Sequence, residues 1–449
     1  FDVIQPYAAI DSIVTFLLYL KLKPAVTKNK KLDNVYNNIL MPASTFLIQI
    51  QENGVPFDMD RLKFAQGEMQ KSIDESIAEL YREPKVREFE EAQGKPFNPN
   101  SVMQLRSFLF DYIGLQPIGK KTGAGKDSTD AEVLQELAEQ HPIPALILNI
   151  RQKSKIKNTY LDKIIPQLDR DGRLRTNFNI HGTTSGRLSS SGRLNMQQLP
   201  RDNSAVKGAI KAAPGHKIIS VDLSTAEVYI VAVLSGDREL MNVFKSGGDF
   251  HSTMAKKVFG LECAVEEVKT LYPLLRQAAK AITFGILYGS GPSKVSDTVN
   301  KEAKANKMDY HFSVEDAQAA IKSYFKQFKK LKEWLDTNQQ FIAKNGYTYS
   351  FFGRKRRLAN VLSTDGGIKS HAIRSGINFL IQSVASDVNL LAAIEMQQYI
   401  NKTGMKARIF ALVHDSILAE VPDDEVERYQ EELEAFIKRD RGVSIPGFA

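Results

Sequence analysis

The sequence predicts an α+β protein, because helical and strand patterns occupy different parts of the chain. Before residue 170, apolar residues recur at three- and four-residue steps, which is the helical spacing. In the second half, two short apolar runs at 217–223 and 408–413 read as strands, and each has an aspartate at or just beyond its end. The 449 residues suggest roughly two to four domains or subdomains.

Helices are expected throughout the first part of the chain. Residues 1–23 predict one helix that starts after Pro6, and residues 28–40 predict a polar connection. A long helix is expected after Asp58, with Asp58 or Asp60 as its cap. Its apolar stripe consists of Leu62, Ala65, Met69, Ile73, Ile77 and Leu80. Residues 118–130 are rich in Gly and Lys and predict a mobile, exposed loop.

Strands and helices are both expected in the second part. Residues 217–223 predict a buried strand that ends in an acidic residue, and Ser224 can cap a following helix that carries Glu227. Further helices are expected from about 268 to 288 and from roughly 378 to 400. Residues 408–413 and 417–421 predict two strands joined by a tight turn at 414–415.

The composition is ordinary for a globular protein, with 43% apolar and 25% charged residues. The single cysteine, Cys263, excludes an internal disulfide and fits a reducing compartment. The apolar run 16–20 is too short to span a bilayer, so no membrane association is expected. The chain opens on Phe1, which suggests that it is cut from something longer.

The net charge of +8 permits a polyanionic partner. Basic residues gather in four patches, although each patch by itself also fits a solvated surface. The patches are Lys28 to Lys31, Lys153 to Lys157, Lys326 to Lys332 and Arg354 to Arg357.

Asp222 and Asp415 are candidate metal ligands. A carboxylate at the end of an apolar strand is costly unless it is paired or binds a cation. Two such carboxylates on adjacent strands suit a pair of Mg²⁺ ions about 3.5–4 Å apart, which is an arrangement used in phosphoryl transfer. The alternative is that each aspartate only caps a turn.

A second candidate group lies on the helix expected from residue 268. Arg276, Lys280, Phe284 and Tyr288 follow one another at steps of four, so they share one slowly drifting face. Two cations followed by two aromatic rings suit a nucleoside triphosphate. The alternative is a basic outer face that runs into a core aromatic pair, but the helix-weakening glycines that follow both rings argue against a purely structural helix.

These motifs together resemble family A DNA polymerases, the DNA polymerase I family. Arg276-Gln-Ala-Ala-Lys280-Ala-Ile-Thr-Phe284-Gly-Ile-Leu-Tyr288 is similar to the fingers-helix signature of the family. Val221-Asp222 through Glu227 and Val413-His414-Asp415 resemble its two palm motifs. Further matches occur at Thr184 to Arg187, Asn195 to Pro200, Asp249-Phe-His251 and Arg374 to Gln382, in the family order. The similarity covers roughly residues 40–440, and it extends upstream through the motifs that begin at Gln51 and Phe97.

The resemblance implies a role for each matching residue. Asp222 and Asp415 would hold two catalytic metal ions with help from the Leu223 carbonyl, and Lys280 would also donate a proton to pyrophosphate. The residues expected around the incoming dNTP are Arg276, Lys280, His251, Phe284, Tyr288 and Glu227, of which Glu227 would exclude a 2′-hydroxyl. The residues expected along the primer–template are Arg187, Asn195, Gln197, Arg374, Asn378, Gln382 and His414, in the minor groove, where polar contacts test geometry without reading sequence.

The implied fold is a right hand, with an antiparallel sheet in the palm and helical fingers and thumb. The expected divisions are 1–27 as the remnant of a 3′–5′ exonuclease, 28–170 as thumb and connection, 171–235 as first palm part, 236–373 as fingers and 374–449 as second palm part. Tyr7 and Asp11 resemble the third exonuclease motif, whose other carboxylates would lie upstream. The family continues beyond Pro446 with another palm strand, so truncation is expected there too.

Three positions depart from the family pattern. Ser416 replaces the usual Glu after the second aspartate, Thr225-Ala226 replaces Gln-Ile, and Thr283 replaces Asn. None removes an expected metal ligand, and they suggest a divergent, phage-type member.

The resemblance therefore implies a template-directed DNA polymerase that uses two Mg²⁺ ions, with Mn²⁺ able to substitute. Primer–template DNA and dNTPs are the expected partners of a monomer in the cytoplasm of a bacterial or phage-infected cell. One alternative is a catalytically silent DNA-binding fragment. Another is a single-subunit RNA polymerase, against which Glu227, Arg187 and Gln382 favour DNA synthesis.

Overall fold

The computed structural model describes residues 4–199, 204–223, 226–245, 249–306, 308 and 310–443. Ser224, the expected helix cap, and Thr225 lie outside these residues. The chain divides into two compact units: residues 1–52, 178–190 and 215–449 form unit 1, and residues 53–177 and 191–214 form unit 2. The five predicted domain divisions stay a prediction.

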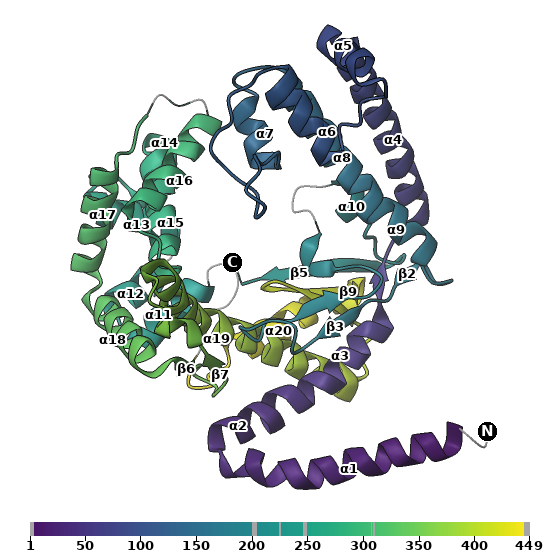
Figure 1. Ribbon diagram of the computed structural model, residues 1–449. Coiled ribbons are helices and arrows are strands. Elements are labelled where there is room, and N and C mark those ends of the chain that lie inside the picture. Colours follow the sequence, from purple (N-terminus) through teal and green to yellow (C-terminus); the bar gives the residue numbers. More distant parts are fainter. Residues whose placement is uncertain are drawn as a thin grey trace. The chain divides into compact units, whose positions relative to one another are not determined.

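Unit 1 contains a three-stranded antiparallel sheet with the order β5-β9-β8 (Figure 1). β8 (Arg408–Val413) and β9 (Ser416–Pro422) form the predicted hairpin, and His414 in its turn has a positive φ of 55°. β5 (His216–Asp222) pairs along the whole of β9, with Asp222 opposite Ser416. The strand prediction is confirmed, but the prediction that β5 is buried is wrong. Only Val221 within it is buried, whereas β8, the other edge strand of the sheet, is mostly buried.

The helices after β5 share one hydrophobic core with the long helix α19 (Gly366–Thr403), which also contacts β9. They are α11 (Ala226–Ser235), α12 (Arg238–Lys245), α13 (Phe250–Phe259), α14 (Val268–Leu271), α15 (Pro273–Leu287), α16 (Pro292–Ala305), α17 (Val314–Gln327) and α18 (Lys329–Asn345). A hairpin of β6 (Tyr347–Tyr349) and β7 (Lys355–Arg357) connects α18 to α19, and α20 (Val426–Lys438) packs against α19 and β9.

Two predicted helices of unit 1 differ in their limits. The single helix expected over 268–288 is broken at Tyr272, whose φ and ψ are −132° and 51°. The cause is local, since a residue before proline avoids the helical conformation and Pro273 follows. α19 begins twelve residues earlier than the expected helix over 378–400, where Asp365 caps it by accepting from Ile368 N. Its apolar window has the length and composition of a membrane span, but 83% of it is buried inside the protein, as in a core helix.

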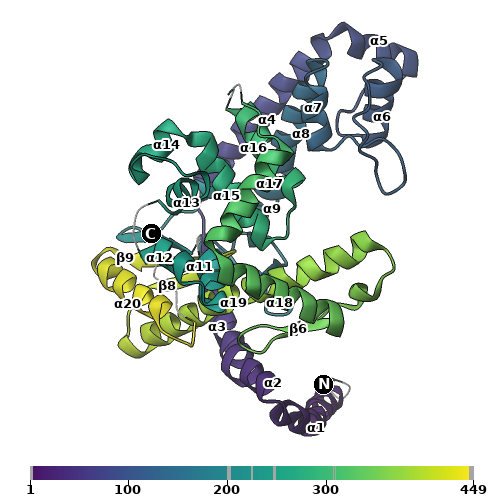
Figure 2. The ribbon, with the colours of Figure 1, turned by 90° about the vertical axis from the view of Figure 1, so that its left-hand side faces the viewer.

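The N-terminal part of unit 1 is helical (Figure 2). α1 (Ile4–Lys28) includes Pro6 in its first turn, so the expected start after Pro6 is wrong; proline is tolerated there because its missing N–H would have no intrahelical partner. The polar connection expected over 28–40 is also wrong. α2 (Lys30–Asn34) and a π-helix (Val35–Leu40) form there, capped by Asn29 and anchored by buried Val35 and Ile39, and α3 (Met41–Asn53) follows.

Unit 2 is mainly helical and has its own core around Phe97 and Phe108. Asp58 caps α4 (Met59–Arg82) as predicted, and Leu62, Ile73 and Leu80 of the expected stripe are buried. The other elements are α5 (Pro84–Gln93), α6 (Val102–Arg106), a π-helix (Ser107–Tyr112), α7 (Ala131–Leu137), α8 (Ile143–Ile156), a π-helix (Lys157–Leu161), α9 (Asp162–Ile164), 3₁₀ helices Ile165–Gln167 and Met196–Gln198, α10 (Ser204–Lys207), and paired strands β1 (Val55–Pro56) and β2 (Arg173–Leu174). The paired strands β3 (Asn177–Asn179) and β4 (Ser189–Ser191) belong mostly to unit 1.

The loop over 118–130 is present and mostly exposed. It folds back on itself through a bridge between Lys121 and Asp127 and a hydrogen bond from Thr122 N to Lys126 O of 2.7 Å. Lys120 at its base forms ion pairs with Asp130 and Glu132.

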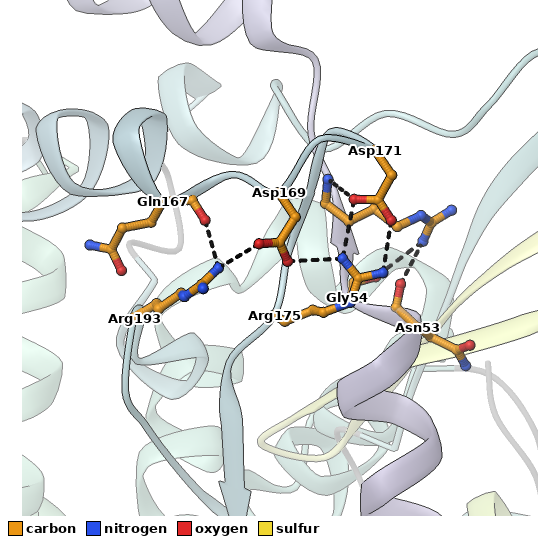
Figure 3. A network of polar contacts seen from close by, with 8 residues as sticks. Asn53, Gly54, Gln167, Asp169, Asp171, Arg175 and Arg193 are labelled. Atoms are coloured by element: carbon orange, nitrogen blue, oxygen red, sulfur yellow. Dashed lines mark hydrogen bonds and ion pairs between the residues drawn. The ribbon is translucent and has the colours of Figure 1, made fainter.

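An arginine–aspartate network fixes the chain around β2 in unit 2 (Figure 3). Arg175 contacts Asp169 at 2.9 Å and Asp171 at 2.7 Å, while Arg193 contacts Asp169 at 2.8 Å. Arg193 also donates to the Gln167 carbonyl at 2.9 Å. The guanidinium groups hold the pKa values of both aspartates below the usual range, so the network stays ionised and connects segments about 20 residues apart.

Candidate active site

The pairing of β5 with β9 brings Asp222 and Asp415 to the same end of the sheet. Leu223 N donates a hydrogen bond to the Asp415 carbonyl at 3.2 Å, and Ser416 Oγ donates to Asp222 Oδ2 at 3.0 Å. Asp222 is exposed and accepts the hydrogen bond from Ser416, so its carboxylate does not carry the cost of a buried, unpaired charge. Asp415 is less accessible, with 22% of its side chain exposed.

Burial raises the pKa of Asp415, and the negative charge of Asp222 raises it further, whereas Arg187 opposes the rise. A cation bound between the two carboxylates would stabilise their ionised forms and so oppose that rise. Exposed His414 lies in the turn immediately before Asp415.

Arg187, Glu227 and Tyr288 form a network beside these aspartates. Arg187 Nη2 lies 3.1 Å from Asp415 Oδ1 and 2.5 Å from Glu227 Oε1. The Tyr288 hydroxyl donates to Glu227 Oε2. Burial raises the pKa of both Glu227 and Tyr288, and the tyrosine hydrogen bond partly offsets the effect for Glu227. Three segments that are distant in sequence therefore meet around one guanidinium group.

The face of α15 forms a charged and then aromatic surface, as its four-residue spacing predicts. Arg276 makes a two-pronged ion pair with Asp249, the N-cap of α13, with distances of 2.6 and 2.8 Å. Lys280, Phe284 and Tyr288 line a hollow of about 270 Å³. The rings of Phe284 and Tyr288 are stacked at 6.3 Å with an angle of 11° between their planes.

His251 projects from α13 toward this surface, with its ring 5.9 Å from that of Phe284. Burial lowers the pKa of His251 to about 4. The neutral imidazole can accept or donate a hydrogen bond, and its Nδ1 has no protein partner among the described residues.

Arg374, Asn378 and Gln382 lie four residues apart on α19, so they share one face. Arg374 lies against the end of α15, because a Cβ on Gly289 would be 2.5 Å from two of its side-chain carbons. Gln382 contacts the Tyr288 hydroxyl. The side-chain amide oxygen of Asn378, Oδ1, is buried and has no protein partner within the described part of the chain.

Four further predicted site residues lie on other elements of the chain. Asn195 and Gln197 belong to unit 2, where the Asn195 side chain caps a 3₁₀ turn by accepting from Gln197 N at 3.1 Å. Tyr7 and Asp11 lie on α1, which has no buried residue, and Asp11 borders a shallow hollow beside Thr15 and Tyr19. The role of these four residues stays a prediction.

The structure adds one buried pair that sequence reasoning missed. Arg354 contacts Asp387 at 2.8 to 3.0 Å, and the Asp387 side chain is fully buried. Burial raises the pKa of Asp387, and Arg354 opposes that rise. A Cβ on Gly186 would lie 2.8 Å from Arg354 Nε, so the guanidinium packs against the segment that presents Arg187. The only charged residue in the segment 379–391, which otherwise holds apolar and uncharged polar residues, was the available signal.

Comparison with known proteins identifies the family. A sequence model described as DNA polymerase family A matches residues 66–446. The chain belongs to DNA polymerase family A. The family A signature predicted from α15 and the two palm motifs is thereby confirmed at the level of the family.

Relatives of this family A chain come from a phage and from bacteria. The DNA polymerase of Escherichia phage T5 is 49% identical over 461 residues, covering 100% of this chain and 54% of the relative. A thermostable DNA polymerase I from Thermus aquaticus is 34% identical over 88% of this chain and 44% of its own length. The chain thus spans about half the length of the curated relatives it matches.

The predicted fold is confirmed by a solved structure, the POL domain of Pol1 from M. smegmatis in complex with DNA primer-template and dNTP. It matches this family A chain with a TM-score of 0.75 and 28% identity, over 91% of this chain and 68% of that one.

Proposed function

We propose that this chain is a template-directed DNA polymerase that adds dNTPs to a primer 3′-hydroxyl. The observation that carries the proposal is the convergence of Asp222 and Asp415 at one end of the β5–β9 pair, where Arg187 and Glu227 link Asp415 to Tyr288 at the end of α15. The DNA polymerases among the relatives and the DNA and dNTP named with the matched solved structure support this choice.

The donor set fits divalent magnesium. Two carboxylates and the Leu223 carbonyl supply hard oxygen ligands, and within the described residues no cluster of three or more His, Cys, Asp or Glu forms a closed metal cage. An open set of this kind leaves positions for triphosphate oxygens and water. When bound, the ions would lower the pKa of the attacking hydroxyl and stabilise the leaving oxygen. We propose Mg²⁺, with Mn²⁺ as a substitute.

The surface of α15 is suited to the triphosphate. Arg276 and Lys280 would bind phosphate oxygens, and phosphate would compete with Asp249 for the Arg276 guanidinium. Lys280 would donate the proton that pyrophosphate needs, His251 would hydrogen-bond a phosphate oxygen, and Phe284 and Tyr288 would pack against sugar and base. Buried Glu227, held by Arg187 and Tyr288, would fill the space beside the sugar 2′ carbon.

The primer–template is the proposed macromolecular partner. Arg187, Arg374, Asn378, Gln382 and His414 would contact its minor groove, and Asn195 and Gln197 would do so from unit 2. We propose that the chain acts as a monomer in the cytoplasm of a bacterial or phage-infected cell, consistent with the sources of the relatives.

Primer extension tests the proposal and its alternatives. Purified protein with Mg²⁺ should extend a primed DNA template with dNTPs far faster than with NTPs. Asp222→Ala and Asp415→Ala should each abolish extension while most DNA affinity remains, whereas Ser416→Glu should change the rate much less. Binding without extension by the unaltered chain would favour the silent DNA-binding fragment, and a preference for NTPs would favour an RNA polymerase.

A further inference from the structure

Two of the basic runs in the sequence meet at the β6–β7 hairpin. Asn34 Nδ2 donates to the Phe352 carbonyl at 2.9 Å, which fastens α2 to the hairpin turn. Gly353 in that turn has a φ of 103°, and a Cβ there would lie 2.8 Å from the Lys31 carbonyl oxygen. The close contact between the two backbones fixes Lys31 beside β7, although more than 300 residues separate them.

The junction gathers two ammonium groups over tyrosine rings. Lys31 Nζ lies 4.1 Å from the centre of the Tyr349 ring, and Lys355 Nζ lies 4.2 Å from that of Tyr347 and 5.4 Å from that of Tyr349. Both lysines and Arg357 are exposed, and none forms an ion pair within the described residues. The acidic residue of α2, Asp33, accepts a hydrogen bond from Asn37.

Like charges repel, so this cluster is stable only because the rings attract the ammonium groups and solvent screens them. An anion between the lysines would relieve the repulsion. A nucleic-acid strand fits better than a free anion, because it brings successive phosphates to the cations and bases to the aromatic rings.

The neighbouring hollow connects this cluster with the proposed active site. It has a volume of about 550 Å³ and is lined on one side by residues 354–357 and on another by Thr183, Thr184 and Gly186. Those last residues lead directly to Arg187, which contacts Asp415. Among the described residues no carboxylate lines the hollow, so a phosphate backbone that leaves the catalytic residues would meet cations, polar groups and the apolar side chains of Leu40, Ile180 and Phe379 there, but no negative charge.

We propose that Lys31 and Lys355, supported by Tyr347 and Tyr349, bind the unpaired arm of the template strand. This inference rests on the proposed polymerase function and adds a partner surface to it. Lys31 lies outside the region matched by the family model, which begins at residue 66, whereas Lys355 lies inside it. The proposed surface therefore combines residues from within and from outside the matched region.

The test uses the variant Lys31→Gln/Lys355→Gln and two labelled primer–templates, one blunt and one with a template arm of about ten nucleotides, a length typical of single-strand sites. Affinity is measured by fluorescence anisotropy over a range of salt concentrations without dNTP. The variant should bind the long-arm substrate roughly tenfold more weakly, and the slope of log K against log salt should fall by about 1.4. Blunt-substrate affinity should not change.

The control variant Lys402→Gln/Lys438→Gln makes the same change in net charge at two exposed lysines on α19 and α20, and it should bind both substrates normally. An equal loss on blunt and long-arm substrates would show a duplex contact and overturn the proposal, as would unchanged binding of both. Extension of a short-arm primer is measured in parallel. If the variant extends the short-arm primer normally but loses no affinity specific to the long-arm substrate, this inference fails while the proposed function stands. If the unaltered protein does not extend the primer, the proposed function itself is contradicted.

Discussion

Breaking the buried Arg354–Asp387 pair should destabilise the protein, and losing the pair should also misplace Arg187. The Asp387 side chain is fully buried, Arg354 is only 13% exposed, and three contacts of 2.8 to 3.0 Å join them. Asp387→Ala would leave a buried guanidinium without its partner, so the free energy of unfolding should fall by about 3–5 kcal/mol. Replacing both residues, as Arg354→Met/Asp387→Leu, should restore most of that stability because no buried charge remains.

Activity should respond differently from stability. The guanidinium packs against Gly186, and Ser386 Oγ donates to the Gly186 carbonyl at 3.4 Å, so the segment before Arg187 depends on α19 and the hairpin turn. Even a stable double variant should therefore extend primers about ten- to a hundredfold more slowly, because small misplacements of a positioning group are costly.

Urea unfolding and single-turnover extension measure the two effects separately. Glu333→Ala, which breaks the exposed Lys330–Glu333 pair, is the control and should cost less than about 1 kcal/mol. A cost below about 1 kcal/mol for Asp387→Ala would refute the claim that the pair is closed to solvent. Full activity in the stable double variant would refute the claim that it positions Arg187.

Three further predictions concern Phe284 of α15 and the residues Glu227 and His251 that other helices place near its aromatic end. Glu227→Ala should raise kcat/KM for NTPs relative to dNTPs because it removes the proposed clash with a 2′-hydroxyl; an unchanged ratio would exclude Glu227 as the gate. Phe284→Tyr should improve the use of dideoxynucleotides, with an aromatic hydroxyl in place of the missing 3′-hydroxyl, and kcat/KM for ddNTPs against dNTPs measures this. The pKa of His251 is about 4 in the folded chain and near 6.5 in the unfolded chain, so between these pH values only the unfolded chain is protonated there. The free energy of unfolding should therefore fall as the pH drops from 6.5 to 4. The expected fall is roughly 1–2 kcal/mol, because solvent screening at the partly exposed side chain reduces the effect. Urea unfolding should show a flatter pH profile over the same range for His251→Asn, and an identical profile would contradict the assignment.

The sequence alone determined the local elements and the chemistry of the proposed site. The stripe from Leu62 to Leu80 predicted α4, and the apolar runs around His414-Asp415 predicted the hairpin, since side-chain period and turn residues are local properties. The motifs also predicted the family, because ordered residue types at fixed spacings need no knowledge of contacts.

Only the tertiary structure decided which distant groups meet. Periodicity shows that a helix has an apolar face, but it does not show what covers that face. The polar sequence of 28–40 was therefore not predicted to be helical, although buried Val35 and Ile39 anchor a helix there. Periodicity likewise does not show that β5 lies at the edge of the sheet or that Asp222 is exposed. The pairing of Arg354 with Asp387 and the gathering of Lys31 with Lys355 depend on long-range packing, because the partners are far apart in the sequence and only the folded core brings them together.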